Sequence, residues 1–398
     1  MRIVVVADDY PPKRSSAAIQ IKDLAESFAL LNCRPIVIIP GAMSQKNSWA
    51  LEDGNGVQVL RLRAPETKGV GFIRRTINEF LMPIFMIYGF KRSPFSDNKF
   101  DGLVWYSPSI FLSLLVGFLK RNSTCRSYLI LRDIFPAWAV DLGLLHQNSL
   151  PYLFFKKIEA YQFSIANTIG IQSAGNLQYF DIDNKKANIK IEVLHNWLAT
   201  TPTSSCSINI DNSILAGRYI FVYAGNMGVA QGMEVLIDLA SSLIQRSDIG
   251  FLFIGRGSYF DTLKELVSKR HLTNVVVFDE IEASEIPALY AQCHVGMIAL
   301  DPRHQTHNIP GKFLSYMQSG LPVLAAINNG NDLEELIKLN LVGEVCTSGS
   351  IDELRKSAES LVESLKGGST MGNNCRALAN RLFSPESAAR QVLSALTL

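Results

Sequence analysis

Glycine-containing turns that could bind an anion occur in three segments of the second half of the chain, and two of these turns carry a positive charge. Arg256 stands between Gly255 and Gly257, directly after the apolar run 250–254. Its guanidinium can form paired, charge-assisted hydrogen bonds to phosphate oxygens, and flanking glycines allow a close approach to a ligand. These residue types predict a contact with a diphosphate. The alternative is a solvated surface arginine.

A second cation opens the motif NIPGKFLSYM at 308–317. Pro310 and Gly311 mark a helix start, where the helix dipole and Lys312 both favour an anion. An ordinary amphipathic helix with an exposed lysine is the alternative. We favour anion binding because three loops of one half share this character.

The third segment reads AGNMG at 224–228 and continues to Gln231 before a helix. Gly225 and Gly228 permit close backbone approach, and the helix start offers unpaired N–H groups to an anion. The same pattern also suits a tight strand-to-helix turn.

Short apolar runs alternating with helix-length segments place these motifs at strand ends, and this alternation predicts parallel sheets covered by helices. In the first half the predicted strands are 2–6, 35–39, 57–62, 102–106, 127–131, 168–171 and 191–194. In the second half they are 219–223, 250–254, 274–278, 295–300, 322–325 and 342–345, with helices at 233–244, 259–269 and 312–318.

A chain of 398 residues favours two domains. The Ser/Thr-rich text at 200–211 is the linker candidate, which predicts domains at 1–200 and 212–384. A last helix at 385–398 is expected to fold back onto the first half. Two such α/β domains bind ligands at the carboxyl ends of their strands, so we expect the active site in the cleft between them.

Composition narrows the class of protein. With 38 basic and 36 acidic residues, no overall charge favours nucleic acid. Six scattered cysteines without a CxxC pair fit a reducing cytosol, and the N-terminus does not read as a signal peptide. No apolar stretch reaches the roughly 18 residues of a spanning helix.

The sequence resembles family 4 glycosyltransferases of the GT-B fold, in particular the bacterial subgroup that builds O-antigen, lipopolysaccharide and capsular polysaccharides and includes N-acetyl-L-fucosamine transferases. The segments that carry the resemblance are DDYPPKRSSAAIQIKDLAESF, RDIFPAWA, YAGNMGVAQGMEVLIDLA, FLFIGRGSYFDTLKEL and NIPGKFLSYMQSGLPVLA. The resemblance implies two Rossmann-like domains facing across a cleft. It also implies an acceptor-binding N-terminal domain and a C-terminal domain that holds a nucleotide-sugar donor.

The resemblance also implies roles for single residues. Arg256 and Lys312 resemble the ligands of the diphosphate, and Asp133 resembles the acidic residue near the reacting sugar, beside Arg132 in place of a frequent histidine. Ile281 is similar in position to the segment whose backbone recognises the base of the donor nucleotide. The remaining residues expected to line the site are Ser15, Ser16, Gly225, Asn226, Gly228, Gln231, Gly255, Gly257, His307, Asn308, Pro310, Gly311 and Ser315.

Two departures from the family pattern concern the donor site. Asn226 and Gln231 stand where many members carry an Arg and a Lys, a variant that the polysaccharide subgroup shares. The usual pair of glutamates falls on His307 and Ser315, neither of which is acidic. His307 or Asn308 then becomes the candidate for the sugar hydroxyls, and Ser315 for the ribose.

The sequence offers little evidence for a metal-binding site or for a nicotinamide-dinucleotide site. The DxD string at 181–183 follows a helix in a polar stretch, and His304 and His307 lack an evident third ligand. No GxGxxG follows the first strand. We therefore expect no metal and no cofactor beyond the UDP-sugar that serves as donor substrate.

The expected reaction is transfer of a sugar, such as an N-acetylaminosugar, from UDP to a sugar on polyprenyl diphosphate. The resemblance implies retention by front-face attack, which requires no dedicated base. Two alternatives stay open: a nucleotide-sugar 2-epimerase, and a non-catalytic nucleotide-sugar-binding subunit.

A basic and apolar segment at 70–92 suggests a peripheral membrane protein, and the lipid-linked acceptors of the resembled subgroup imply the cytoplasmic face of the inner membrane. Arg74, Arg75, Lys91 and Arg92 flank the apolar run 80–90, as in segments that lie on anionic bilayers. A helix packed in the first domain with a charged rim is the alternative.

Overall fold

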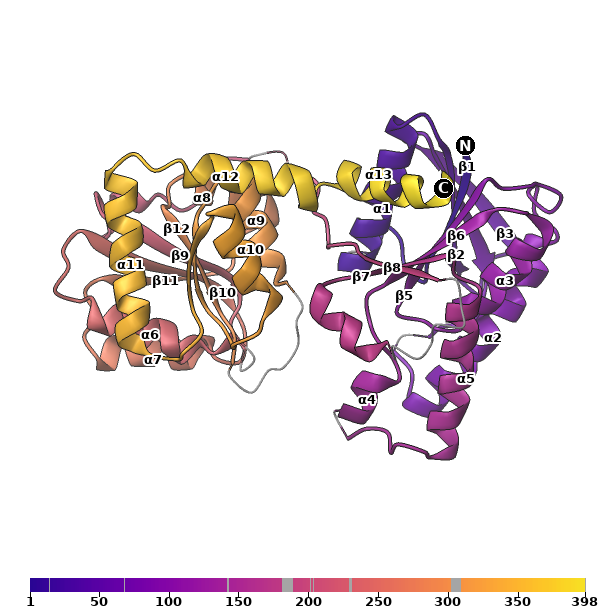
Figure 1. Ribbon diagram of the computed structural model, residues 1–398, viewed down its shortest axis with the longest axis horizontal. Coiled ribbons are helices and arrows are strands. Elements are labelled where there is room, and N and C mark those ends of the chain that lie inside the picture. Colours follow the sequence, from indigo (N-terminus) through magenta and orange to yellow (C-terminus); the bar gives the residue numbers. More distant parts are fainter. Residues whose placement is uncertain are drawn as a thin grey trace. The chain divides into compact units, whose positions relative to one another are not determined.

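The computed structural model describes residues 1–13, 15–67, 69–141, 143–180, 189–200, 202, 204–228, 231–301 and 309–397. The chain folds into two compact units, Met1–Trp197 with Pro385–Leu398, and Leu198–Ser384 (Figure 1). It passes from one unit to the other after Trp197 and again after Ser384. Each unit is an α/β structure, as the sequence predicts.

The first unit is built on an eight-stranded sheet in the order β3-β4-β2-β1-β5-β6-β7-β8. Among the described strands of this sheet only β3, at one edge, runs antiparallel to its neighbour, and no predicted strand corresponds to it. The strands are β1 (Arg2–Val6), β2 (Arg34–Gly41), β3 (Trp49–Gly54), β4 (Val57–Arg63), β5 (Gly102–Ser107), β6 (Arg126–Leu131), β7 (Thr168–Ile171) and β8 (Lys190–Val193).

Helices cover both faces of this sheet. Residues of α1 (Ser16–Leu30) and α13 (Pro385–Thr397) share one apolar core with one face, and these two helices lie side by side in Figure 1. Residues of α2 (Phe72–Phe90) and α3 (Leu112–Asn122) pack on the other face. The remaining helices of the unit are α4 (Ala137–Asp141), α5 (Leu150–Ser164) and the 3-10 turn Ala174–Tyr179. Among the described residues, no helix is long and apolar enough to cross a membrane.

The second unit contains a six-stranded parallel sheet in the order β11-β10-β9-β12-β13-β14. Every strand corresponds to a predicted apolar run, with ends shifted by a few residues. The strands are β9 (Tyr219–Asn226), β10 (Ile249–Arg256), β11 (Val275–Asp279), β12 (Val295–Ala299), β13 (Val323–Ala326) and β14 (Gly343–Cys346).

Two groups of helices enclose this second sheet. One face packs against α6 (Met233–Ser242), α7 (Phe260–Lys269) and α11 (Ile351–Lys366). The other packs against α8 (Ile286–Tyr290), α9 (Gly311–Ser319), α10 (Asp332–Asn340) and α12 (Met371–Leu378). The turns 210–212 and 283–285 and the π-helical segment Ala379–Phe383 complete the unit.

The predicted linker differs from the structure. Ile208 and Ile210 are buried in the core of the second unit, and the backbone N–H of Ile210 donates to Gln292 Oε1 at 3.0 Å. The Ser/Thr-rich composition of the segment predicted a linker, although these two isoleucines are buried. The segment therefore belongs to the second unit, and the boundary lies earlier, between Trp197 and Leu198.

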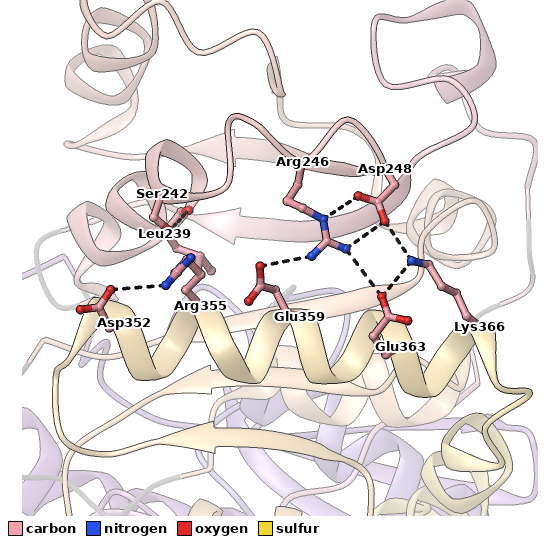
Figure 2. Close-up of polar contacts among 9 residues, drawn as sticks. All are labelled: Leu239, Ser242, Arg246, Asp248, Asp352, Arg355, Glu359, Glu363 and Lys366. Atoms are coloured by element: carbon pink, nitrogen blue, oxygen red, sulfur yellow. Dashed lines mark hydrogen bonds and ion pairs between the residues drawn. The ribbon is translucent and has the colours of Figure 1, made fainter.

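An ion-pair network stabilises the amino end of β10 (Figure 2). Arg246 donates to both carboxylate oxygens of Asp248, at 2.9 and 3.0 Å, and to Glu359 of α11 at 3.2 Å. Lys366 bonds to Asp248 at 3.1 Å and to Glu363 at 2.9 Å. These bonds fasten α11 to the loop that precedes β10.

Candidate functional site

The carboxyl ends of β9 and β10 carry two loops whose backbones pack directly on each other. The strand register pairs Gly225 with Gly255. A Cβ on Gly255 would lie 1.9 Å from the carbonyl oxygen of Gly225, and a Cβ on Gly257, where φ is +143°, would lie 2.4 Å from that of Met227. Both glycines are therefore required by backbone packing, whatever Arg256 binds. Backbone packing is thus a second reason for these glycines, beside the close approach of a ligand that the sequence suggests.

Gln231 holds the backbone at the end of β9 and just after it, at 226–228, in place. Its Oε1 accepts hydrogen bonds from the backbone N–H of Gly228 at 2.9 Å and from Asn226 Nδ2 at 3.3 Å. The Tyr223 hydroxyl donates to the Asn226 carbonyl oxygen at 2.7 Å. Neutral groups thus shape this loop, so positive charge for an anion has to come from neighbouring elements.

Lys312 supplies such a charge from the first turn of α9. Its Nζ lies 3.4 Å from the centre of the Tyr223 ring, a cation–π contact. Burial lowers the pKa of the amine to about 7. Within the described part of the chain, no carboxylate offsets this desolvation. A diphosphate at this point would provide the missing counter-charge.

The start of α9 also offers backbone donors. Pro310 is the N-cap and Gly311 the first helical residue, one position before the predicted helix 312–318, and no side chain caps this end in the described residues. The first N–H groups of the helix therefore suit an anion. Ser315 is half-buried on the same helix. His304, His307, Asn308 and the 181–183 string lie outside the described residues.

Arg256, the last residue of β10, is paired with a carboxylate. Its side chain is 78% exposed, and Nε lies 3.0 Å from Glu280 Oε2. Ile281 follows Glu280 and packs half-buried against the core. The register places Arg256 beside Asn226 on β9. Arg256 and Lys312 therefore both lie at the carboxyl end of the sheet. The Arg256 side chain is exposed to solvent, whereas the Lys312 amine is buried.

The first unit has its own polar rim, at the carboxyl end of β1. Ser15 caps α1 by accepting from the Ala18 N–H at 3.2 Å and donates to Asp9 Oδ2 at 2.5 Å. Lys13 Nζ lies 3.2 Å from the other Asp9 oxygen. Ser16 is the first residue of α1. The buried Asp9 carboxylate thus holds the predicted serine loop in place.

Arg132 and Asp133 follow β6 and have different surroundings. The buried Arg132 guanidinium donates to the backbone oxygens of Leu194 at 2.7 Å and His195 at 3.3 Å, and it lies 5.0 Å from the Trp197 ring centre. Arg132 therefore fastens the segment 194–197, which follows β8, to the end of β6. Desolvation raises the pKa of the Asp133 carboxyl, and the neighbouring Arg132 charge opposes that shift. Asp133 remains the candidate acid on this rim.

Sequence reasoning missed Tyr223, Glu280 and Asp9. Tyr223 sits in an apolar run and reads as core, although the lysine lies over its ring. Asp9 belongs to the DDYPP turn, whose two acids after a strand were a usable signal. No group of three or more metal-ligating side chains occurs among the described residues.

Comparison with known proteins adds family information. Residues 218–364, most of the second unit, match the family model of the glycosyl transferases group 1. The probable glycosyltransferase WbjE of Pseudomonas aeruginosa is 23% identical over 226 residues, which cover 55% of this chain and 55% of that protein. This chain thus matches only about half the length of that relative. Both comparisons support the group 1 glycosyltransferase family.

Solved structures match the chain over nearly its whole length. Sucrose-phosphate synthase from Thermosynechococcus elongatus aligns with a TM-score of 0.65 at 13% identity, covering 99% of this chain and 97% of the other. HepE from Anabaena in complex with UDP-glucose aligns with a TM-score of 0.61 at 16% identity, covering 100% and 99%. At these identities the likeness shows the fold alone. The predicted GT-B fold, with two parallel-sheet domains, is confirmed.

Proposed function

We propose that this chain transfers a sugar from a UDP-sugar to a lipid-linked sugar, with the donor on the second unit and the acceptor on the first. The observation that carries the proposal is Lys312, a desolvated amine at a helix start for which the described residues provide no side-chain cap. It lies within the segment that matches group 1 glycosyltransferases. A nucleoside diphosphate has the charge that this arrangement lacks.

In the proposed reaction, the bond between the anomeric carbon and the UDP oxygen breaks. A new bond forms between that carbon and the acceptor oxygen on the same face. The acceptor proton passes to the departing phosphate, so configuration is retained and no separate base is used. Lys312, Arg256 and the first N–H groups of α9 stabilise the negative charge that develops on the leaving diphosphate. No metal ion enters this proposal.

The other predicted site residues have supporting roles in this proposal. Gly225 to Gly228 form the floor under the donor sugar, with Asn226 and Gln231 fixing its shape. The segment around Ile281 faces the base. Ser15, Ser16 and Asp133 line the acceptor side, where Asp133 acts near the reacting sugar.

The substrates of the proposal follow from relatives. HepE has been crystallised with UDP-glucose, which supports a UDP-sugar as donor. WbjE is described as a probable glycosyltransferase. The subgroup resemblance favours an N-acetylaminosugar such as N-acetyl-L-fucosamine, and an acceptor sugar on polyprenyl diphosphate in O-antigen or capsule synthesis. Such an acceptor fits an enzyme at the cytoplasmic face of the inner membrane, held there by residues 70–92.

A substrate screen tests this function. The purified chain is incubated with UDP-, GDP- and dTDP-sugars, with and without a GlcNAc-diphosphate-lipid analogue in detergent, and products are identified by mass spectrometry and NMR. We expect a lengthened lipid-linked product of retained configuration only with a UDP-sugar. Lys312→Ala and Arg256→Ala should reduce its formation.

Each alternative gives another result. A 2-epimerase converts the UDP-sugar without acceptor, and a binding subunit retains UDP but never turns over. Either outcome, or a product of inverted configuration, contradicts the proposal.

A further inference from the structure

One face of α2 is apolar and exposed along the whole helix. Its exposed apolar residues are Ile73, Ile77, Phe80, Ile84 and Tyr88. They are spaced by four, three, four and four residues, which places them in one narrow stripe. The opposite side, with Met82 and Met86, is buried against the sheet.

The amino end of α5 extends this stripe. Leu150, Leu153 and Phe154 are exposed, with Leu150 at 83%. The Phe154 ring lies 6.1 Å from that of Phe80 on α2, so the two exposed faces are continuous. Leu144, in the loop before α5, is exposed as well. The apolar surface therefore comes from two helices far apart in sequence, beyond the segment 70–92.

Cations border this surface. Arg92 lies with its guanidinium carbon 3.6 Å from the centre of the Tyr88 ring at the end of the stripe, and Arg74 is exposed near its beginning. On α5, exposed Lys157 follows Leu150, Leu153 and Phe154 with helical spacing and thus continues the same face. The acid on α2, Glu79, is paired with Arg75 at 2.7 Å. Apolar side chains rimmed by net positive charge fit an anionic lipid interface.

We propose that this two-helix surface, formed by the outer faces of α2 and the first turns of α5, inserts into the headgroup region of an anionic bilayer. A second copy of the chain suits it less well, because symmetric pairing of the same face would bring the bordering cations together. The inference deepens the proposed function, since it brings the enzyme to a lipid-linked acceptor. It is tested without any substrate.

The test is flotation of the full chain with vesicles of phosphatidylcholine, with and without phosphatidylglycerol. Two membrane pairs are compared, Ile77→Ser with Ile84→Ser on α2, and Leu150→Ser with Leu153→Ser on α5. The control pair, Leu30→Ser with Leu339→Ser, replaces leucines that are 83% and 74% exposed elsewhere. We expect each membrane pair to weaken vesicle binding about tenfold and the control pair to leave it unchanged. Lys157→Gln should weaken binding about fivefold, with anionic vesicles only.

Three results would overturn the inference. The α5 pair could behave as the control does, in which case α2 alone binds lipid. Both membrane pairs could bind as the unchanged chain does. Size-exclusion chromatography could instead reveal a dimer that the membrane pairs dissociate, with no vesicle binding. Unchanged thermal unfolding of the variants excludes misfolding, and transfer to a detergent-solubilised acceptor reports separately on the proposed function.

Discussion

Two lysines lie over two tyrosines of the same strand, β9, in opposite electrostatic surroundings. Lys366 Nζ lies 5.9 Å from the Tyr219 ring centre and also bonds to Asp248 and Glu363, which raise its pKa. Lys312 Nζ lies 3.4 Å from the Tyr223 ring centre, and burial lowers its pKa to about 7. One lysine has its counter-charges within the protein, and the other has none among the described residues.

The arginines at the two ends of β10 repeat this difference. Arg246, just before the strand, bonds to Asp248 and to Glu359 of α11 (Figure 2). Arg256, at the other end, has one exposed carboxylate partner, Glu280. At the amino end of the sheet the cations are bonded to several acids, whereas at the carboxyl end they have one exposed partner or, among the described residues, none. That asymmetry supports the proposed donor site at the carboxyl end.

The largest expected effect separates the two lysines. Lys312→Met should lower kcat/KM for the UDP-sugar by about 100-fold or more, because a charge that stabilises the leaving diphosphate is lost. Lys366→Met is the matched control and should change kcat/KM less than about twofold, since its ion pairs are solvent-exposed. Initial rates of UDP release measure both variants. An equal loss of kcat/KM in the two variants would mean that the difference in surroundings between Lys312 and Lys366 has no bearing on catalysis.

The second prediction concerns pH. Because the pKa of Lys312 in the ligand-free protein is about 7, a growing fraction of the amine is neutral above pH 7. Binding of UDP then requires proton uptake, and its affinity should fall with rising pH by up to about tenfold per unit. Below pH 7 this contribution is flat. Isothermal titration calorimetry between pH 7 and 9 measures the slope, and Lys312→Arg should remove it. A slope that persists in that variant would assign the pH dependence to another group.

A smaller effect is expected at the exposed end of β10. Arg256→Met should raise KM for the UDP-sugar about tenfold, as one charge-assisted contact to the diphosphate is lost. Glu280→Gln should lower KM by about two- to threefold, because it removes the carboxylate that competes for Arg256. The double variant should behave as Arg256→Met alone. A Glu280→Gln effect that survives in the double variant would show that Glu280 acts independently of Arg256.

The fold was largely predictable from sequence, and the site only in part. Each strand of the second unit can be recognised in the sequence as an apolar run, because both faces of a parallel sheet are buried. The antiparallel edge strand β3, with its exposed acidic end Glu52 to Gly54, gave no such signal. Lys312 was identified from a helix start, but the aromatic ring that it contacts belongs to Tyr223, 89 positions earlier in the sequence. A contact of that kind is set by tertiary packing, which no local pattern encodes.

The glycines around Arg256 illustrate the same limit. Their pattern pointed to a ligand, yet backbone packing against Gly225 and Met227 already requires them. The orientation of Arg256 toward Glu280 was likewise invisible in sequence. Residue types predicted which charges gather at the carboxyl end, and tertiary structure decides which of them is already paired.

The smallest expected effect is on stability, and it has opposite signs at the two ends of the sheet. Arg246→Met should lower the free energy of unfolding by about 1 kcal/mol, because partly exposed networks contribute little. Lys312→Met should raise it by about 1 to 2 kcal/mol at pH 7, since the folded state there holds a desolvated amine that the unfolded chain solvates.

The pH dependence distinguishes these two contributions. Arg246 lowers the pKa of Asp248, so the stability from this pair is present above the unfolded carboxyl pKa and is lost as pH falls through the folded value. The pKa of Lys312 is lowered as well, so here too the unfolded state binds more protons, but the protonated form of this base is the charged one and burial disfavours it. Its unfavourable contribution is therefore complete below pH 7 and disappears as pH rises toward the unfolded value of 10.5. Urea unfolding at pH 7 and pH 9 should show the advantage of Lys312→Met shrinking at the higher pH, whereas the Arg246→Met deficit stays constant. A Lys312→Met variant that is less stable than the unchanged chain at pH 7 would mean that the Tyr223 contact outweighs the desolvation, and that the amine is a structural cation like Lys366.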